Sequence, residues 1–362
     1  MSSKLNYTKP YYPIMLLMIG YWLIAIYFII FLQYDFLKSD VLSYWQDSLK
    51  WQTPFNLYHV PLYPLIIAIL NGITFGVFHP IFLMMSINLA AFLSSTLFIY
   101  KIIQRGGASV KIAALSSLFF GLWPFIGLTY TVNPLADIPA MFFLLAGLLL
   151  LQRSCRLTAA MFLGLSLVTH KAMWVFVGLL VLSEIFHCKQ YFSKKNLLFI
   201  GIIFLPIGIL WISGAFYYNS NTWLFSGISN GIIASNIIGD LSETLKQAGI
   251  KDLIKGILLF GIAVISAFSI SISVRLKYQY YHYGIIISLA VILLFLIIDT
   301  NAIWAVMRFG RLLVIPLAFI INAKQLFNNK SCGTTPVIIS IIIMLLLSQF
   351  AYAWYWGCIY YK

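Results

Sequence analysis

Charged residues are scarce in this chain of 362 residues. Only 9% are Asp, Glu, Lys or Arg, whereas 62% are hydrophobic and the mean hydropathy is +0.96. Soluble domains have about a quarter of their residues charged, so this scarcity excludes an ordinary soluble domain. The composition predicts an all-α polytopic membrane protein.

Cysteine is also scarce. The chain has four cysteines, and none falls in a CxxC motif or another paired spacing, which gives no support to a disulfide framework or a zinc site. Internal repeats, low-complexity segments and a separate soluble stretch are lacking too. Residues 1–362 are therefore interpreted as a single transmembrane domain.

A membrane-spanning helix needs about 20 apolar residues. The first apolar stretch is too long for a signal-peptide core and has no small-residue cleavage site, so we expect it to be retained. About eleven spans are predicted by this length criterion. They cover 12–32, 80–103, 109–128, 135–152, 155–169, 172–187, 196–216, 253–274, 281–298, 303–322 and 336–357.

The apolar run 61–76 is too short to cross a bilayer. As a helix it would extend about 24 Å, against a hydrocarbon core of about 30 Å. Two prolines mark its start and two glycines loosen its end. We expect a juxtamembrane helix that lies in or dips into the interface, within a first external loop at 33–79.

Basic and acidic residues are distributed unequally between the loops. If the N-terminus is cytoplasmic and 61–76 does not cross, most loop Lys and Arg lie on the cytoplasmic side, where Glu184 is the one acidic residue. This is the positive-inside pattern, and it explains the net charge of +14 without a nucleic-acid partner. The other acidic residues face the periplasm of a bacterial inner membrane or the lumen of the endoplasmic reticulum, as does a second external loop at 217–252.

The first external loop carries the most concentrated acidic residues. Residues 39–51 predict a short amphipathic helix. Its apolar face is expected to hold Val41, Leu42, Trp45 and Leu49, and its polar face Asp40, Tyr44 and Asp47. Two carboxylates at this spacing could serve as base and orienter or hold a divalent cation. The alternative is that they only solvate an interfacial helix.

Three further polar residues are predicted on the same side of the membrane. Asp137 opens a span, where it could cap the helix or present a carboxylate at the external end of the bundle. Lys171, in the break between two apolar runs, could snorkel or meet a phosphate. Its neighbour His170 could be a structural hydrogen-bonding group, which is the commoner role for a lone histidine.

Two arginines mark the predicted span 303–322. Arg308 and Arg311 are three residues apart and share a helix face. An arginine inside a span costs roughly 3 kcal/mol unless it is paired or faces water, and a phosphate suits guanidinium geometry. Cations, carboxylates and apolar walls together indicate a lipid-phosphate substrate.

Five segments of the chain resemble, in order, those of polytopic glycosyltransferases with the GT-C fold, particularly the protein O-mannosyltransferase and aminoarabinose-transferase-like group. The segments are SDVLSYWQDSL, HVPLYPLIIAILNGITFG, NPLADIPAMFFLLAGLLLLQR, GLSLVTHKAMWVF and RFGRLLVIP. The resemblance implies transfer of a sugar from a polyprenyl-phosphate donor to a hydroxyl of a protein, lipid or glycan acceptor.

The resemblance also implies roles for particular residues. Asp40 would be the general base, and Asp137 would orient the acceptor or bind a metal. The cations that would neutralise the leaving phosphate are Lys171, Arg308 and Arg311, and the other expected substrate contacts are His170, Tyr44 and His59. No cofactor is identified by the sequence beyond the divalent cation that the two carboxylates could hold.

Two other functions fit part of the pattern. A flippase or transporter for a lipid-linked glycan would line its pathway with charged residues, but no inverted repeat is found and the polar residues gather on one face. A protein similar to O-antigen polymerases would also use external arginines, with larger external loops.

Overall fold

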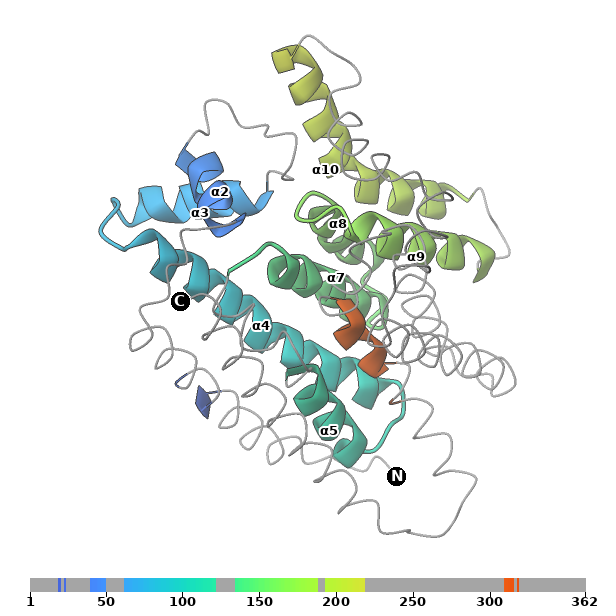
Figure 1. Cartoon of the computed structure of the whole chain (residues 1–362). Helices are drawn as coiled ribbons and strands as arrows, with labels where there is room; N and C mark the ends of the chain where they lie inside the picture. The colour runs from blue at the N-terminus through green and yellow to red at the C-terminus, as the bar shows by residue number, and fades with distance from the viewer. Residues whose placement is uncertain are drawn as a thin grey trace, which may run out of the picture.

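The computed structural model describes residues 19–20, 23, 40–49, 62–121, 134–187, 193–218, 309–315 and 318. Within these ranges every regular element is a helix and no strand occurs, so the described part of the chain is all-α (Figure 1). The elements are α2 (Asp40–Leu49), α3 (Leu62–Ile73), α4 (Pro80–Arg105), α5 (Val110–Gly121), α7 (Asp137–Leu151), α8 (Arg156–Leu167), α9 (Met173–His187), α10 (Lys194–Tyr218) and the 3₁₀ helix η1 (Gly310–Leu313).

Two of the described helices are long and apolar enough to cross a membrane, Ile81–Arg105 and Lys194–Phe216. Helices α5, α7, α8 and α9 have 12, 15, 12 and 15 residues, which is shorter than the roughly 20 residues of a typical span. The number of spans therefore stays a prediction. Three predicted spans, 253–274, 281–298 and 336–357, lie outside the described residues, and of the span 12–32 only residues 19, 20 and 23 are described. The predicted external loop at 217–252 also lies outside the described residues after Tyr218.

Helix α3 confirms the prediction of a short helix within 61–76. Its 12 residues correspond to about 18 Å of helix. The helix ends in a tight turn, where the Gly76 amide donates to the Asn71 carbonyl at 2.9 Å and Phe75 and Gly76 both have positive φ. Helix α4 follows at once and begins with Pro80, because proline is tolerated where the helical N–H has no partner.

Small residues allow α7, α8 and α10 to pack closely. A Cβ on Gly147 of α7 would lie 2.8 Å from the Leu163 side chain of α8. A Cβ on Gly164 of α8 would lie 2.6 Å from the Ile203 carbonyl of α10 and 3.0 Å from Pro206. Helices with glycine at their interface can bring their backbones together, which is how apolar helices associate without a hydrophobic driving force.

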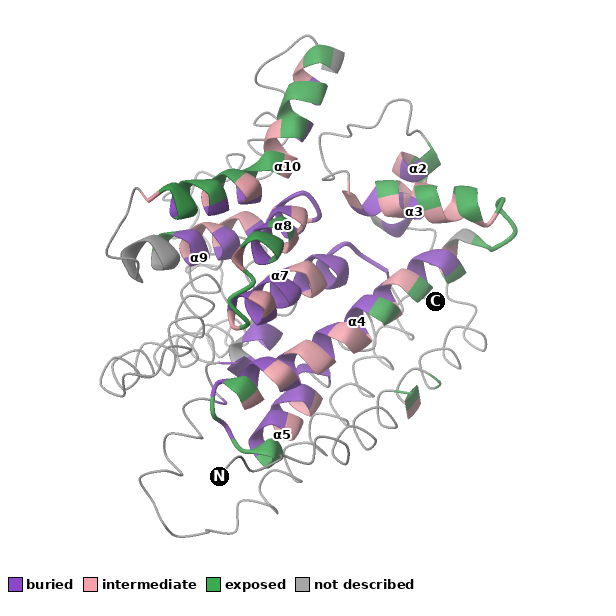
Figure 2. Ribbon diagram, turned by 180° about the vertical axis from the view of Figure 1, so that it is seen from behind, coloured by how far each residue is buried: buried purple, intermediate pink, exposed green. Residues whose placement is uncertain are grey.

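One apolar core joins most of these helices. Residues of α4, α5, α7, α8, α9, α10 and η1 form it, whereas α2 and α3 join the start of α4 through a second apolar cluster. Figure 2 shows buried residues lining α4 and α7 and exposed residues on the outer faces of α3 and α10. The exposed face of α10 is apolar and includes Leu205, Ile209, Ile212 and Phe216, as expected for contact with lipid.

Hydrogen bonds between helices define two ends of the bundle. At one end, Gln152 Nε2 donates to the Ile102 carbonyl at 3.2 Å, and an Arg156 guanidinium nitrogen donates to Asn196 Oδ1 at 3.1 Å. At the other end, Asn88 Nδ2 donates to the Leu135 carbonyl at 2.9 Å. The first bond joins the C-terminal ends of α4 and α7, and the second joins the N-terminal ends of α8 and α10. The third bond joins α4 to the segment before α7, at the opposite end of the bundle.

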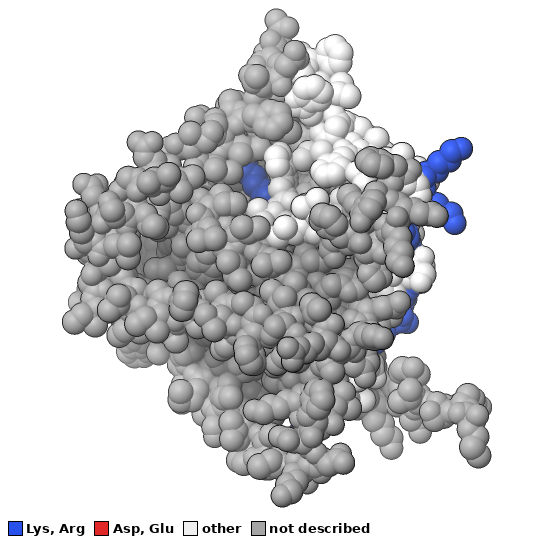
Figure 3. All heavy atoms as spheres, turned by 90° about the vertical axis from the view of Figure 1, so that its right-hand side faces the viewer, with Lys and Arg blue, Asp and Glu red and all other residues white. Residues whose placement is uncertain are grey.

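The exposed cations of the described residues all lie at the first of these ends. They are Arg105, Lys111, Arg153, Lys194 and Lys195. Figure 3 shows Lys and Arg side chains standing out along one edge of the face it draws. Within the described part of the chain, the loops predicted to share the cytoplasmic side thus lie at one end of the helices, which agrees with the predicted pattern.

The close contact between α8 and α10 predicts a steric effect at Gly164. The substitution Gly164→Ala should lower the free energy of unfolding by about 1–3 kcal/mol, because the new methyl group meets a backbone carbonyl that cannot rotate away. Reversible unfolding of the purified chain in mild detergent measures this difference.

The matched control for this prediction is Gly201→Ala in α10. No atom lies within 4 Å of the Cβ that this substitution adds, and alanine favours the helix over glycine by roughly 1 kcal/mol. The control should be neutral or stabilising. Equal losses in the two variants would contradict the proposed packing of α8 on α10.

Candidate functional site

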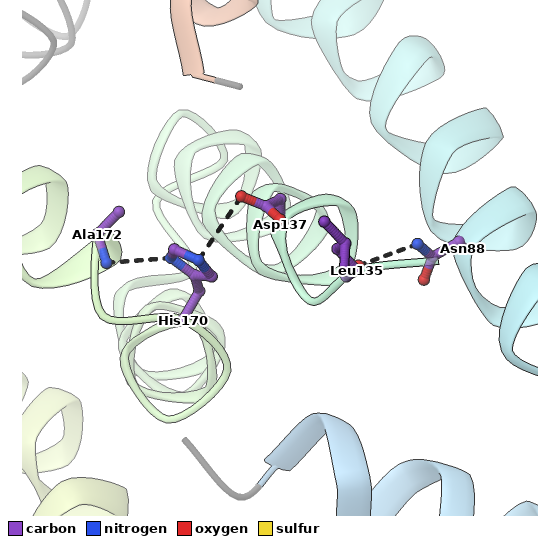
Figure 4. A network of polar contacts seen from close by, with 5 residues as sticks. All are labelled: Asn88, Leu135, Asp137, His170 and Ala172. Carbon is purple, nitrogen blue, oxygen red and sulfur yellow. Dashed lines mark hydrogen bonds and ion pairs between the residues drawn. The ribbon is translucent and has the colours of Figure 1, made fainter. Parts of the chain in front are cut away.

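Asp137 is the first residue of α7 and is almost completely buried, with 3% of its side chain exposed. One interpretation of the sequence made this residue the N-cap of the helix, and the structure corrects it. The N-cap is Ala136, and it makes no side-chain cap hydrogen bond. The Asp137 carboxylate points away from the helix axis toward His170 (Figure 4). Its charge still benefits from the dipole of the first helical turn.

His170 lies in the turn 168–172, which confirms the predicted break between two apolar helices. Its Nδ1 accepts the Ala172 backbone N–H at 3.1 Å, and its Nε2 lies 3.6 Å from Asp137 Oδ1 (Figure 4). One fifth of the side chain is exposed. The ring also contacts Phe309, with 5.4 Å between ring centroids. The turn therefore brings an imidazole and a buried carboxylate together.

Lys171 follows in the same turn and is half-buried. Burial lowers its pKa below the ordinary lysine value, because the charged ammonium loses part of its hydration. A phosphate near this ammonium would raise the pKa again, because a negative charge favours the protonated form. The carboxylate of Asp137 and the ammonium of Lys171 thus stand on adjacent elements at the same end of the bundle.

A second polar group joins α3, α4 and the segment before α7. The Tyr63 hydroxyl lies 3.0 Å from Asn88 Oδ1 and 3.2 Å from the Pro134 carbonyl, and Asn88 Nδ2 donates to the Leu135 carbonyl. Burial raises the pKa of Tyr63 well above 10.0, and the charges of Tyr44 and Asp137 add to this. The hydroxyl is therefore protonated and acts as the donor.

Helix α2 lies against this second group. Its Tyr44 ring packs edge-on against Tyr63, with 5.2 Å between ring centroids, and its Val41 shares an apolar cluster with Ala136. The helix begins at Asp40, whose side chain is outside the described part of the structure. The element that carries the predicted base is therefore beside the residue that precedes Asp137.

The faces predicted for α2 need a correction. The structure buries Val41, Tyr44 and Ser48 and leaves Leu49 exposed, whereas the sequence placed Leu49 on the apolar face and Tyr44 with the carboxylates. The reason is the ring contact with Tyr63, because packing two aromatic rings together stabilises the helix more than burying the leucine at its last position would. With 7% of its surface exposed, Tyr44 packs within the protein and offers little area to a substrate.

Arg311 is fully buried in η1. Its guanidinium carbon lies 6.0 Å from the Phe92 ring centroid on α4 and 5.6 Å from that of Phe120 on α5. Such cation–π contacts stabilise a buried arginine. In this conformation the guanidinium supports the packing of η1 on α4 and α5 and has no exposed surface for a phosphate.

The structure thus brings three of the predicted site residues together, Asp137, His170 and Lys171. Arg308 and His59 lie outside the described residues. The sequence interpretation missed the pair Tyr63 and Asn88. An asparagine in the middle of an otherwise apolar helix is a signal that could have found it, because a buried amide needs hydrogen-bonding partners.

Within the described ranges, no three His, Cys, Asp or Glu side chains are grouped as a metal site. Asp137 and His170 could supply two ligands, and cation sites of the magnesium or calcium type need further oxygen ligands. The divalent cation predicted from the carboxylates therefore depends on Asp40 and stays a prediction.

Comparison of the chain with protein families, with curated proteins and with solved structures finds no match. The resemblance of five segments to glycosyltransferases with the GT-C fold therefore remains a prediction.

The bond between Tyr63 and Asn88 predicts a loss of stability on its removal. Tyr63→Phe should lower the free energy of unfolding by about 1–2 kcal/mol, because it removes the donor and leaves buried acceptors without it. Asn88→Ala should also destabilise the protein. The loss of stability in the double variant should be smaller than the sum of the losses in the two single variants, as expected for groups that bond each other. Full additivity, measured by detergent-phase unfolding, would contradict the bond.

Proposed function

We propose that this chain is a polytopic membrane glycosyltransferase of the GT-C type. It transfers a sugar from a polyprenyl-phosphate donor to an acceptor hydroxyl on the external or lumenal side of the membrane. The observation that carries the proposal is the approach of the Asp137 carboxylate to His170, which Lys171 follows in the same turn, at the end of the bundle opposite the exposed cations. Helix α2, which begins at Asp40, packs beside this end.

The distribution of charge supports the orientation. The end that gathers the exposed lysines and arginines suits the cytoplasm. The opposite end, with Asp137, then faces the periplasm or the lumen of the endoplasmic reticulum. With this orientation the N-terminus is cytoplasmic, and about eleven helices cross the membrane by the length criterion.

The proposed reaction is a single displacement with inversion at the anomeric carbon. The acceptor oxygen forms a bond to that carbon while the bond from the carbon to the donor phosphate oxygen breaks. The bonding electron pair leaves with the polyprenyl phosphate, and the acceptor proton passes to the Asp40 carboxylate. Asp137 orients the acceptor hydroxyl from the start of α7.

Lys171 is the described cation that suits the leaving phosphate. It stands in the same turn as His170, keeps part of its surface exposed and is otherwise surrounded by protein. An ammonium that has lost hydration gains more from a phosphate than an ammonium in water does, because the local dielectric is low. Apolar walls beside it would hold the lipid part of the donor.

Transfer of the sugar tests the proposed function. The purified chain is incubated with a panel of labelled polyprenyl-phosphate hexoses and pentoses and with membrane extracts as the source of acceptor. Loss of label from the lipid and its appearance in an acceptor would support the enzyme. Movement of intact donor across a vesicle membrane without transfer would instead identify the flippase, for which the buried charge of Arg311 within the helical core is the favourable observation.

Asp40→Asn should reduce sugar transfer by about 10²–10⁴-fold, because general-base assistance is lost. The thermal unfolding midpoint should be unchanged. Asp47→Asn in the same helix is the matched control and should keep near-normal turnover. Normal turnover by Asp40→Asn would reject its assignment as the base.

Lys171→Ala should mainly weaken use of the donor, seen as a raised KM for the polyprenyl-phosphate sugar. Lys111→Ala, which removes an exposed lysine at the opposite end, is the control and should have no effect. An unchanged dependence on donor concentration in Lys171→Ala would count against the phosphate contact.

The lowered pKa of Lys171 gives this contact a pH dependence. As pH rises through that pKa, the ammonium loses its proton and donor binding should weaken at a pH below 10.5. Lys171→Arg should retain donor binding over the same alkaline range, because the guanidinium stays charged.

A further inference from the structure

We infer that His170 is a positioning residue: it holds the Asp137 carboxylate in place and does not itself contact the substrate. This gives His170 a different role from the substrate contact expected from the sequence. The kinetic test of this inference rests on the proposed function. A second test, which measures the protonation of the two ring nitrogens, does not depend on any activity.

The backbone of the turn selects the tautomer of His170. Nδ1 accepts the Ala172 N–H at 3.1 Å, and a ring nitrogen that accepts a hydrogen bond carries no proton. The neutral ring therefore has its proton on Nε2, the nitrogen that faces Asp137 Oδ1 at 3.6 Å. The Nδ1 lone pair is already used and Nε2 already has its proton, so the neutral ring has no free site for a proton from a substrate.

A backbone hydrogen bond and an aromatic neighbour also hold His170. Its own backbone N–H donates to the Ser166 carbonyl at 3.2 Å. The Phe309 ring lies 5.4 Å away and is itself buried against Phe176 at 5.8 Å. Phe309 is adjacent to η1, whose Arg311 is buried between the rings of α4 and α5. Phe309 thus packs against the imidazole, and Nε2 faces the Asp137 carboxylate (Figure 4).

Asp137 needs such a neighbour. A carboxylate that is 3% exposed has lost most of its hydration, which is unfavourable unless a donor or a positive charge replaces the water. The helix dipole supplies part of this, and the polar Nε2–H of His170 faces Oδ1 at 3.6 Å, an electrostatic contact longer than a hydrogen bond. This contact at one oxygen favours one orientation of the carboxylate toward an acceptor hydroxyl, and orientation is what a positioning residue contributes to rate.

Two substitutions separate the two contacts of the imidazole. His170→Asn keeps an acceptor that can bond the N–H two residues ahead, as in an Asx turn, but it is too short to reach Asp137. His170→Gln places an amide donor near the position of Nε2 and loses the local acceptor. If His170 positions Asp137, the Gln variant keeps most of the transfer rate, and the Asn variant loses about 100-fold in kcat with little change in the donor KM.

Other kinetic outcomes overturn the inference. Full activity in the Asn variant with loss in the Gln variant would make His170 only an element of the turn. A raised donor KM in both variants, without a fall in kcat, would return it to the role of a substrate contact. Thermal unfolding of each variant shows whether its fold is retained.

The second test needs no substrate. The full chain is labelled with ¹⁵N-histidine, and the His170 signals are identified by their loss in His170→Asn. We expect an unprotonated Nδ1 and a protonated Nε2, with the Nε2 signal shifting in Asp137→Asn. An Nδ1–H tautomer, or no response to Asp137→Asn, overturns the inference. If the wild type transfers no sugar but passes this test, the proposed function fails while the contact with Asp137 stands.

Discussion

The burial of one carboxylate is the constraint on which the candidate site depends. Asp137 stands at the start of α7, where an apolar bundle excludes most of the water that would otherwise hydrate it. Two features of the surrounding elements offset part of that cost. The positive end of the α7 dipole lies near the charge, and the turn between α8 and α9 brings the imidazole of His170 to 3.6 Å from it. The ends of α3 and α4 are held nearby by the Tyr63–Asn88 bond, which fixes the segment that leads into Asp137.

Close packing of the helices makes this arrangement possible. Gly147 and Gly164 let α7, α8 and α10 approach to near backbone contact, so that the turn after α8 comes level with the start of α7. The same packing brings the exposed cations of α4, α5, α10 and the turn after α7 to the opposite end. In the described part of the chain, the separation of the exposed cations from the candidate site therefore comes from alternating helix directions, and the proposed glycosyltransferase would depend on that separation.

Several features could be predicted from the sequence because they depend on local physics. The short helix α3, the proline start of α4 and the break at 168–172 follow from run length and from residues that stop or start a helix. The features that were predicted wrongly or missed depend on distant contacts. Tyr44 is buried because Tyr63 lies opposite it, and the Asp137 carboxylate approaches His170, a residue 33 positions later in the chain.

The sequence by itself determined that this chain is helical and apolar and that its loop charges separate into two groups, because hydropathy and charge are properties of residues taken one at a time. Only the tertiary structure decided which polar groups meet. It joined Asp137 to His170 and enclosed Arg311 between the rings of Phe92 and Phe120. The orientation of a side chain depends on neighbours that other helices supply, and no local pattern records which helices those are.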